Sequence, residues 1–329
     1  MTTTRRVGIR GTGSYVPERR LTNEDLQALV DTSDEWITSR TGIKERRLVA
    51  EGQTTSDMAV AAAQRALDAA GMTADQLGLI LVATVSGDYL FPSTACLVQT
   101  KLGAPQVGCV DLGAACSGFV YALSTAHAMA TTGAADNILV IGVESLSKIT
   151  NYEDRASCIL FGDGAGAAIV STEFEHGELL SSSLHAEGAG EDVIKLPAGG
   201  TARPASHETV DERLHMMQLR GREVYKFAVG KMVELVENAK ETHSDLELGY
   251  IVPHQVNLRI LESARQRLEL SADQVFVNIE KYGNTSAASI PIGLDEVVRG
   301  GRLDSHAGKL VVLCAFGAGL TWGSVSLKW

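Results

Sequence analysis

Hydrophobic and polar positions divide the chain into two kinds of segment. Short, nearly continuous apolar runs are typical of strands buried on both faces, and they lie at residues 7–13, 77–85, 107–112, 137–143, 165–171, 248–253, 275–279, 309–315 and 321–327. Segments with apolar positions spaced as on one helix face lie at residues 22–30, 33–42, 55–70, 93–102, 119–129, 221–241, 256–268 and 284–299. Strands that alternate with helices predict an α/β fold with a mostly parallel sheet.

The order of these predicted elements repeats. Each half reads helix, strand, helix, strand, helix, strand, strand, so the run at 77–85 corresponds to 248–253 and the run at 137–143 to 309–315. The repeat predicts two α/β halves, residues 1–175 and 176–329, related by a pseudo-twofold axis. Residues 187–213 are polar and weakly periodic, which predicts a long surface excursion.

Composition and charge restrict the classes of function. The 329 residues are 45% hydrophobic and 21% charged, as in soluble globular proteins, and the net charge of −11 argues against nucleic acid as the main partner. No apolar run approaches the ~20 residues of a membrane span, and the first residues lack the apolar core of a signal peptide. The five cysteines form no Cys-x-x-Cys pair or Cys/His cluster. We therefore expect no metal site, and reduced thiols in a cytoplasmic protein.

One cysteine stands where a strand turns into a helix. Cys116 follows the apolar run 107–112 and small residues, and an amphipathic segment begins directly after it. At a helix N-terminus the free N–H groups and the positive end of the dipole favour a thiolate, as a nucleophile requires. A buried structural cysteine would be equally ordinary on position alone.

Three further sites lie at matching points of the second half. His254 follows the run 248–253, Asn284 precedes the last helix, and residues 316–319 form a glycine-rich turn between the last two strands. A core histidine, an N-cap and a β-turn would explain each of them singly. Because strand ends and helix N-termini gather at one edge of an α/β sheet, these residues are expected to converge on one pocket with Cys116.

Six motifs, in order along nearly the whole chain, resemble those of the β-ketoacyl-acyl carrier protein synthase III family of the thiolase superfamily. They lie at residues 34–43, 114–119, 161–166, 253–259, 283–289 and 316–319. The resemblance implies a thiolase-like fold, with the two halves packed as a five-layered α-β-α-β-α core. It also implies a Cys-His-Asn catalytic triad made of Cys116, His254 and Asn284.

The resemblance further implies a two-step reaction. An acyl-CoA, by default acetyl-CoA, acylates Cys116, and a decarboxylative Claisen condensation with malonyl-acyl carrier protein (malonyl-ACP) then gives 3-oxoacyl-ACP and initiates fatty-acid synthesis. His254 and Asn284 would stabilise the enolate, and the N–H groups of Cys116 and Ala318 the tetrahedral oxyanion. The family usually has glycine at the position of Ala318. Phe316 would shield the thiolate, and no cofactor would be needed.

The resemblance also implies contacts to coenzyme A, the carrier protein and a second subunit. Trp36 and Arg155 would sandwich the adenine, a role that suits two planar groups. The other contacts implied for coenzyme A are Arg40, Gly221, Asn257 and Arg259. An acidic carrier would dock on basic residues against the overall repulsion, and these are Arg222, Lys226, Arg259 and Arg267. Phe91 would cross the interface of a homodimer to close the partner's acyl pocket.

Other readings remain open from the sequence. A starter-unit ketosynthase or acyltransferase of a secondary-metabolite pathway would carry the same motifs and use a different acyl-CoA. A thiolase would normally have a second cysteine where Phe316 stands, and a type III polyketide synthase is typically longer. A hydroxymethylglutaryl-CoA synthase needs a glutamate base, which none of the six motifs supplies. A non-catalytic acyl-CoA binder would be expected to lack Cys116.

Overall fold

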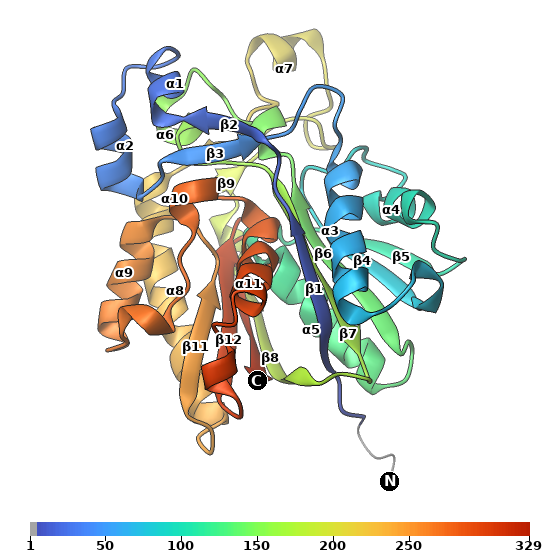
Figure 1. The fold of residues 1–329 in the computed structure, drawn as a ribbon. Helices are drawn as coiled ribbons and strands as arrows, with labels where there is room; N and C mark the ends of the chain where they lie inside the picture. Colours follow the sequence, from blue (N-terminus) through green and yellow to red (C-terminus); the bar gives the residue numbers. More distant parts are fainter. Residues whose placement is uncertain (1–4) are drawn as a thin grey trace.

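The computed structural model describes residues 5–329; residues 1–4, part of the segment examined for a signal peptide, lie outside the described residues (Figure 1). The strands of the first half are β1 (Gly8–Tyr15), β2 (Arg19–Thr22), β3 (Glu45–Leu48), β4 (Leu79–Ala83), β5 (Gly108–Leu112), β6 (Asn137–Glu144) and β7 (Gly164–Ser171). Its helices are α1 (Asn23–Gln27), α2 (Asp34–Thr41), α3 (Thr55–Ala70), α4 (Thr94–Leu102), α5 (Gly118–Thr131) and α6 (Arg155–Cys158).

The second half follows the same plan. Its strands are β8 (His176–Ala186), β9 (Ile194–Lys195), β10 (Gln218–Leu219), β11 (Leu248–Pro253), β12 (Leu310–Gly317) and β13 (Thr321–Lys328). Its helices are α7 (His207–Asp211), α8 (Gly221–Thr242), α9 (Leu258–Arg267), α10 (Ile279–Tyr282) and α11 (Ser289–Arg299). Within the described residues, no helix combines the length and apolar character that crossing a membrane requires.

Local sequence signals account for the ends of the main helices. Thr54 and Asp57 form a capping box at the start of α3, and Gly71 ends that helix in the left-handed conformation. The alanine-rich face of α3 is buried, because small side chains let this helix lie close against β1 and β7. These signals explain why the predicted span 55–70 agrees with the structure.

The strand pairing confirms the predicted duplication. The first half has the order β5-β4-β6-β7-β1 and the second β11-β12-β13-β8. β4 is parallel to β6 as β11 is to β12, and both halves continue with antiparallel strands. A short antiparallel pairing of β1 with β8 joins the halves into one nine-stranded sheet. The division at residues 175 and 176 falls between β7 and β8, and it stays a prediction.

The elements form the five alternating layers that were expected. Helices α3 and α4 cover the outer face of the first half-sheet, and α8 and α9 cover that of the second (Figure 1). Helices α5 and α11 lie between the half-sheets and contact strands of both. Three apolar clusters fill the spaces between these layers. The middle layer matters most for function, because the segments that lead into α5 and α11 carry Cys116 and Asn284.

Several predicted elements differ in the structure. Residues 275–279 do not form a full strand, since Val275 makes a single bridge to Ile251 and α10 follows at Ile279. The edge position leaves that segment one neighbour in place of two. Strand β8, which alternates buried and exposed residues, was not predicted. Asn284 is separated from α11 by a 3₁₀ turn, η6 (Ser286–Ala288). The excursion at 187–213 contains β9 and the short α7.

Gly142 provides a test of the close packing in the middle layer. A Cβ added at Gly142 of β6 would lie 2.2 Å from the carbonyl oxygen of Ala287, in η6. Because backbone cannot move aside cheaply, we expect Gly142→Ala to lower the free energy of unfolding by about 2 kcal/mol. Gly230→Ala, in α8, is the matched control, since a Cβ there meets nothing within 4 Å and alanine favours a helix. Urea denaturation measures both; equal stability of the two variants would contradict the packing argument.

Candidate active site

The residues predicted to converge do line one cavity. It has a volume of about 280 Å³ and lies at the ends of β11 and β12, beside the segments that lead into α5 and α11. Five predicted residues line it: Cys116, His254, Asn284, Phe316 and Ala318. Most of the remaining lining is apolar, and it includes Leu146, Leu160, Met217, Leu219 and Phe227. The cavity therefore combines a few polar groups with a water-excluding wall, as a small-molecule site does.

Cys116 lies in a 3₁₀ turn, η2 (Ala115–Ser117), directly before α5. The pKa of its thiol is raised to about 12, mainly by burial; a hydrogen bond with the Ser286 side chain works against this rise, and the nearby Glu144 carboxylate adds to it. The helix N-terminus was expected to favour a thiolate. The protonated thiol is instead the resting form, because desolvation of the enclosed sulfur outweighs the dipole.

The turn after β12 packs directly against the nucleophile. A Cβ at Gly317 would lie 2.8 Å from the Cβ of Cys116, so only glycine fits there. Ala318 is the next residue. Its φ angle is not positive, because it is absent from the non-glycine residues with positive φ in the range 5–329. An alanine is therefore compatible with this turn, although the family usually has glycine. Within the same described range, the Ala318 N–H has no hydrogen-bond partner, so it remains available for an oxyanion, whereas the Cys116 N–H contacts its own sulfur.

His254 is fully buried directly after β11. Its Nδ1 lies 2.7 Å from the Ser289 Oγ, which also accepts a hydrogen bond from the Gln255 N–H. In the described residues its Nε2 has no partner. Desolvation lowers the pKa of His254 to about 3, so the ring is neutral. Phe316 contacts the ring edge to face, with the centroids 5.7 Å apart.

Asn284 is held by three hydrogen bonds. Its N–H donates to the Leu160 carbonyl, its carbonyl accepts from the Gly162 N–H, and its side-chain Oδ1 accepts from the Ser286 N–H at 2.8 Å. The Oδ1 is thus occupied by backbone, which fixes the orientation of the amide and leaves the Nδ2 hydrogens for the cavity. Asn284 therefore presents a donor, as the enolate role requires.

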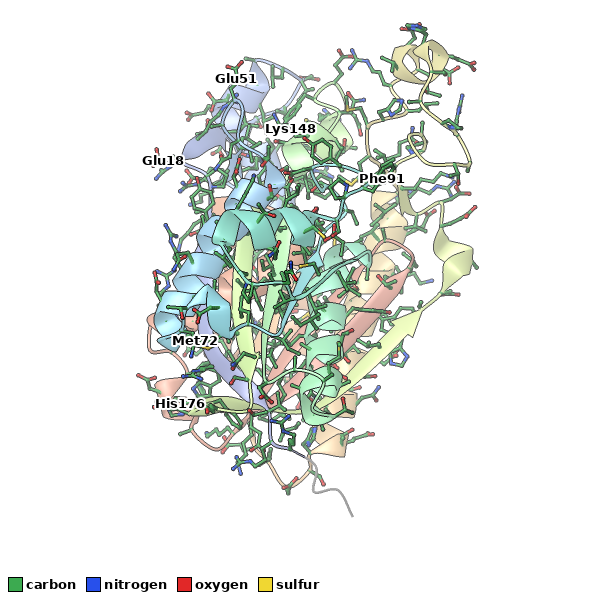
Figure 2. The ribbon with its side chains drawn as sticks, turned by 90° about the vertical axis from the view of Figure 1, so that its right-hand side faces the viewer. Glu18, Glu51, Met72, Phe91, Lys148 and His176 are labelled. Carbon is green, nitrogen blue, oxygen red and sulfur yellow. The ribbon has the colours of Figure 1, made fainter. Side chains whose placement is uncertain are left out.

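Phe91 lies away from this cavity in the same chain. Its side chain is 85% exposed, and the adjacent Tyr89 and Leu90 are exposed as well (Figure 2). Strand β5 is the edge of the sheet, and its Val110 is also exposed. An exposed loop of apolar residues is more often part of an interaction surface than a surface that stays in contact with solvent.

The residues assigned to adenine lie together near α2. The guanidinium carbons of Arg40 and Arg155 lie 4.7 and 4.8 Å from the Trp36 ring centroid. Arg155 also donates to the Asp31 carbonyl. An adenine between Trp36 and Arg155 would need a gap of about 7 Å, two stacking distances. Arg155 must therefore swing off the ring before a base can enter.

Asn257 and Gly221 lie at helix starts. The Asn257 Oδ1 caps α9 by accepting from the Arg259 N–H, and its Nδ2 donates to the Arg40 carbonyl. Gly221 begins α8 and is exposed, and a Cβ there would make only an ordinary contact, 3.8 Å from the Leu219 Cδ1. Asn257 therefore already ties α9 to α2, and it retains one amide hydrogen and one lone pair for a ligand.

The four basic residues assigned to carrier docking are exposed on two adjacent helices. Arg222 and Lys226 lie on α8, and Arg259 and Arg267 on α9. The two helices pack together, with a hydrogen bond of 2.9 Å between Tyr225 and Ser263. In residues 5–329 none of the four forms an ion pair. Val224 and Phe227 of α8 line the cavity, so this basic surface borders its entrance.

Sequence reasoning missed three residues around the triad. Ser286 and Ser289 belong to the motif at 283–289 but received no role. A serine among small residues at the start of a helix is usually interpreted as a packing residue. Glu144 ends β6 and is fully buried. None of the six motifs supplies the glutamate that a hydroxymethylglutaryl-CoA synthase needs. Glu144, outside the motifs, nevertheless accepts a hydrogen bond from Ser286 and affects the pKa of Cys116. Its position at the end of a buried strand was the available signal.

Comparisons with known proteins agree with the motifs. Family models described as 3-oxoacyl-[acyl-carrier-protein (ACP)] synthase III match residues 110–188, and the model of its C-terminal part matches residues 237–329. Curated β-ketoacyl-[acyl-carrier-protein] synthases III of Caldanaerobacter subterraneus subsp. tengcongensis and Clostridioides difficile are 51% and 47% identical, each match covering 98% of this chain and 97% and 98% of the relative.

Solved structures give the same result. The 3-oxoacyl-[acyl-carrier-protein] synthase III of Aquifex aeolicus matches with a TM-score of 0.89 and 43% identity, over 98% of this chain and 100% of that one. The priming β-ketosynthase of the R1128 polyketide pathway also has a TM-score of 0.89, with 32% identity over 100% and 98% of the two chains. The chain therefore belongs to the β-ketoacyl-acyl carrier protein synthase III family of condensing acyltransferases.

Proposed function

We propose that this protein transfers an acyl group from acyl-CoA to Cys116 and condenses it with malonyl-ACP, which gives 3-oxoacyl-ACP and starts fatty-acid synthesis. The observation that carries the proposal is the convergence of Cys116, His254 and Asn284 on one apolar cavity, in a chain of this family. Acetyl-CoA is the default starter. Both substrates enter as thioesters, so the reaction needs no cofactor.

In the first step the Cys116 sulfur attacks the thioester carbonyl, and the coenzyme A thiol leaves. The oxygen that becomes negative accepts hydrogen bonds from the N–H groups of Cys116 and Ala318, and the Ala318 N–H has no other partner among residues 5–329. Donors fixed before the reaction stabilise such an oxyanion without a reorganisation cost.

In the second step malonyl-ACP loses CO2, and the enolate attacks the acyl-enzyme. In the tautomer that this step needs, Ser289 donates to the His254 Nδ1, 2.7 Å away, and the ring proton on Nε2 serves as a donor in the cavity. The Asn284 Nδ2 is the second donor, because its Oδ1 is engaged by Ser286. Both groups are neutral, and Phe316 offers the departing carboxylate only an apolar surface, which favours decarboxylation.

Coenzyme A and the carrier approach from the face formed by α2, α8 and α9. Trp36, Arg40 and Arg155 take the adenine and phosphate end, with Arg155 moving off the ring. Gly221 and Asn257 contact the pantetheine arm, and Arg259 contacts a phosphate of coenzyme A. The acidic carrier docks on Arg222, Lys226, Arg259 and Arg267, whose charges are not neutralised by ion pairs in the described part of the chain.

The exposed loop with Phe91 and the free edge of β5 support a homodimer, in which Phe91 closes the acyl pocket of the second subunit. Its proposed compartment is the cytoplasm. A second function follows from one comparison. The priming β-ketosynthase of a polyketide pathway matches over the full chain, and a largely apolar cavity of about 280 Å³ would leave room for starters larger than acetyl. A starter-unit ketosynthase with a non-acetyl acyl-CoA is the alternative.

The central experiment is intact mass spectrometry of the protein after incubation with a panel of acyl-CoAs. We expect a gain of one acyl group on the wild type and none on Cys116→Ala, because the sulfur is the only nucleophile assigned to the cavity. The preferred acyl-CoA separates the primary function from the alternative. An acyl gain that persists in Cys116→Ala would contradict the assignment.

His254→Ala and Asn284→Ala test the division of roles. We expect each to slow decarboxylative condensation by about 100-fold or more, since each removes one enolate donor, while self-acylation falls much less. Release of CO2 from malonyl-ACP measures the first rate, and mass spectrometry the second. Equal loss in both steps would show that the two residues serve the thiol rather than the enolate.

Charge reversal tests the docking surface. In the double variant Arg222→Glu/Lys226→Glu, repulsion of the acidic carrier should raise KM for malonyl-ACP by about 10-fold or more, with self-acylation by acyl-CoA little changed. Lys240→Glu is the matched control, because Lys240 is exposed on the same helix about 20 Å away. An equal KM for both variants would rule out this surface.

A further inference from the structure

A buried carboxylate lies behind the cavity without a role in the proposed steps. Glu144 ends β6 and has no exposed surface. Its Oε2 accepts hydrogen bonds from the Ser86 hydroxyl at 2.5 Å, the Val85 N–H at 3.2 Å and the Thr84 hydroxyl at 3.3 Å. A buried carboxylate is costly.

A serine connects this carboxylate to the nucleophile. The Ser286 hydroxyl donates to the Glu144 Oε1 at 3.1 Å. Ser286 also affects the pKa of the Cys116 thiol through a side-chain hydrogen bond, and both residues line the cavity. Ser286 is held in the left-handed conformation, with φ of 49°, by the turn that also orients Asn284. The hydroxyl is thus fixed between a thiol and a carboxylate.

We propose that Ser286 relays the proton of the Cys116 thiol to Glu144 when the sulfur attacks the acyl-CoA. The inference rests on the proposed function, whose steps name no acceptor for that proton.

The proton balance is closed. The S–H bond of Cys116 breaks as its proton passes to the Ser286 Oγ, and the Ser286 proton passes to the Glu144 Oε1. The electron pair left on sulfur forms the bond to the thioester carbonyl carbon, and the bond to the coenzyme A sulfur breaks with its electron pair. The proton then returns from Glu144 through Ser286 to the departing coenzyme A sulfur. No other reactant is needed.

Electrostatics favour Glu144 over His254 as the acceptor. A proton on His254 would add a cation to a desolvated site, where the pKa of the ring is already lowered to about 3. Transfer to Glu144 moves one negative charge from carboxylate to sulfur and buries no additional charge. Burial raises the pKa of Glu144 to about 7, so the group accepts a proton more readily than an ordinary carboxylate.

The relay predicts a pH dependence. The titratable groups facing Cys116 are Glu144 from β6 and His254 after β11; Cys314 of β12 has a thiol pKa of about 12, raised by burial. Glu144 itself faces the uncharged groups of residues 84–86 and Ser286. Below pH 7 the carboxyl is protonated and cannot accept, so the reactivity of Cys116 should fall as the pH drops through about 7.

The experiment measures two rates between pH 5 and 9 on the full-length protein: self-acylation by acyl-CoA, and alkylation of Cys116 by iodoacetamide, which needs no acyl-CoA. Peptide mass spectrometry reads each cysteine separately. In the wild type both rates should show an inflection near pH 7. Glu144→Gln and Ser286→Ala should lose it, and their rates at pH 7 should fall about 100-fold.

Thr84→Val is the matched control. It removes a hydrogen bond that lowers the pKa of Glu144 but leaves the relay intact, so its inflection should persist and move to higher pH. Exposed Cys96 is the internal control, since the relay does not reach it and its alkylation should be the same in every variant.

A charge effect without proton transfer predicts the opposite sign. Glu144→Gln would then react faster than the wild type, because the carboxylate raises the pKa of the thiol, and that result would overturn the relay. An unchanged inflection in Ser286→Ala would do the same. If the variants do not fold, the wild-type protein still tests the relay. An alkylation profile of Cys116 without an inflection near pH 7 would overturn it. Alkylation with the inflection but without acylation by any acyl-CoA would support the relay and reject the proposed function.

Discussion

The close approach of backbone segments in the middle layer determines the geometry of the site. η6 lies against β6 where Gly142 has no side chain, and the turn at Gly317 lies against Cys116. Gly118, at the start of α5, faces Ala83 and Ala287 at similar range. Because small residues occupy these contacts, the segments that carry Cys116 and Asn284 can meet the ends of β11 and β12. Larger side chains would separate the nucleophile from its partners.

Desolvation then sets the charge state of the site. Burial raises the pKa of Cys116 and Glu144 and lowers that of His254, so in every case it works against the charged form, although Glu144, with a pKa of about 7, is still a carboxylate above that pH. A neutral imidazole and a fixed amide can donate hydrogen bonds to an enolate. Because neither group is charged, neither forms an ion pair with the malonyl carboxylate. The same exclusion of water makes a free thiolate costly. A proton acceptor that takes the thiol proton as the sulfur attacks avoids this cost.

The sequence predicted most of the fold because the apolar runs are long and the halves repeat. The failures occur where tertiary context overrides the pattern. Residues 275–279 are apolar but lie at a sheet edge and make one bridge, and β8 alternates too weakly in burial to stand out. The triad was predicted from motifs. Ser286, Ser289 and Glu144 were not, because hydrogen bonds between residues 35 and 142 positions apart do not show in the local pattern.

The central claim is that acyl-Cys116 and malonyl-ACP react in one coupled step within this cavity. The most direct measurement is a single turnover in which wild-type protein, first acylated and freed of excess acyl-CoA, is mixed with malonyl-ACP, and CO2 and 3-oxoacyl-ACP are counted together. The account predicts equal amounts of both, limited by the acyl-enzyme present. Release of CO2 without 3-oxoacyl-ACP, or product formed without acyl-enzyme, would contradict it.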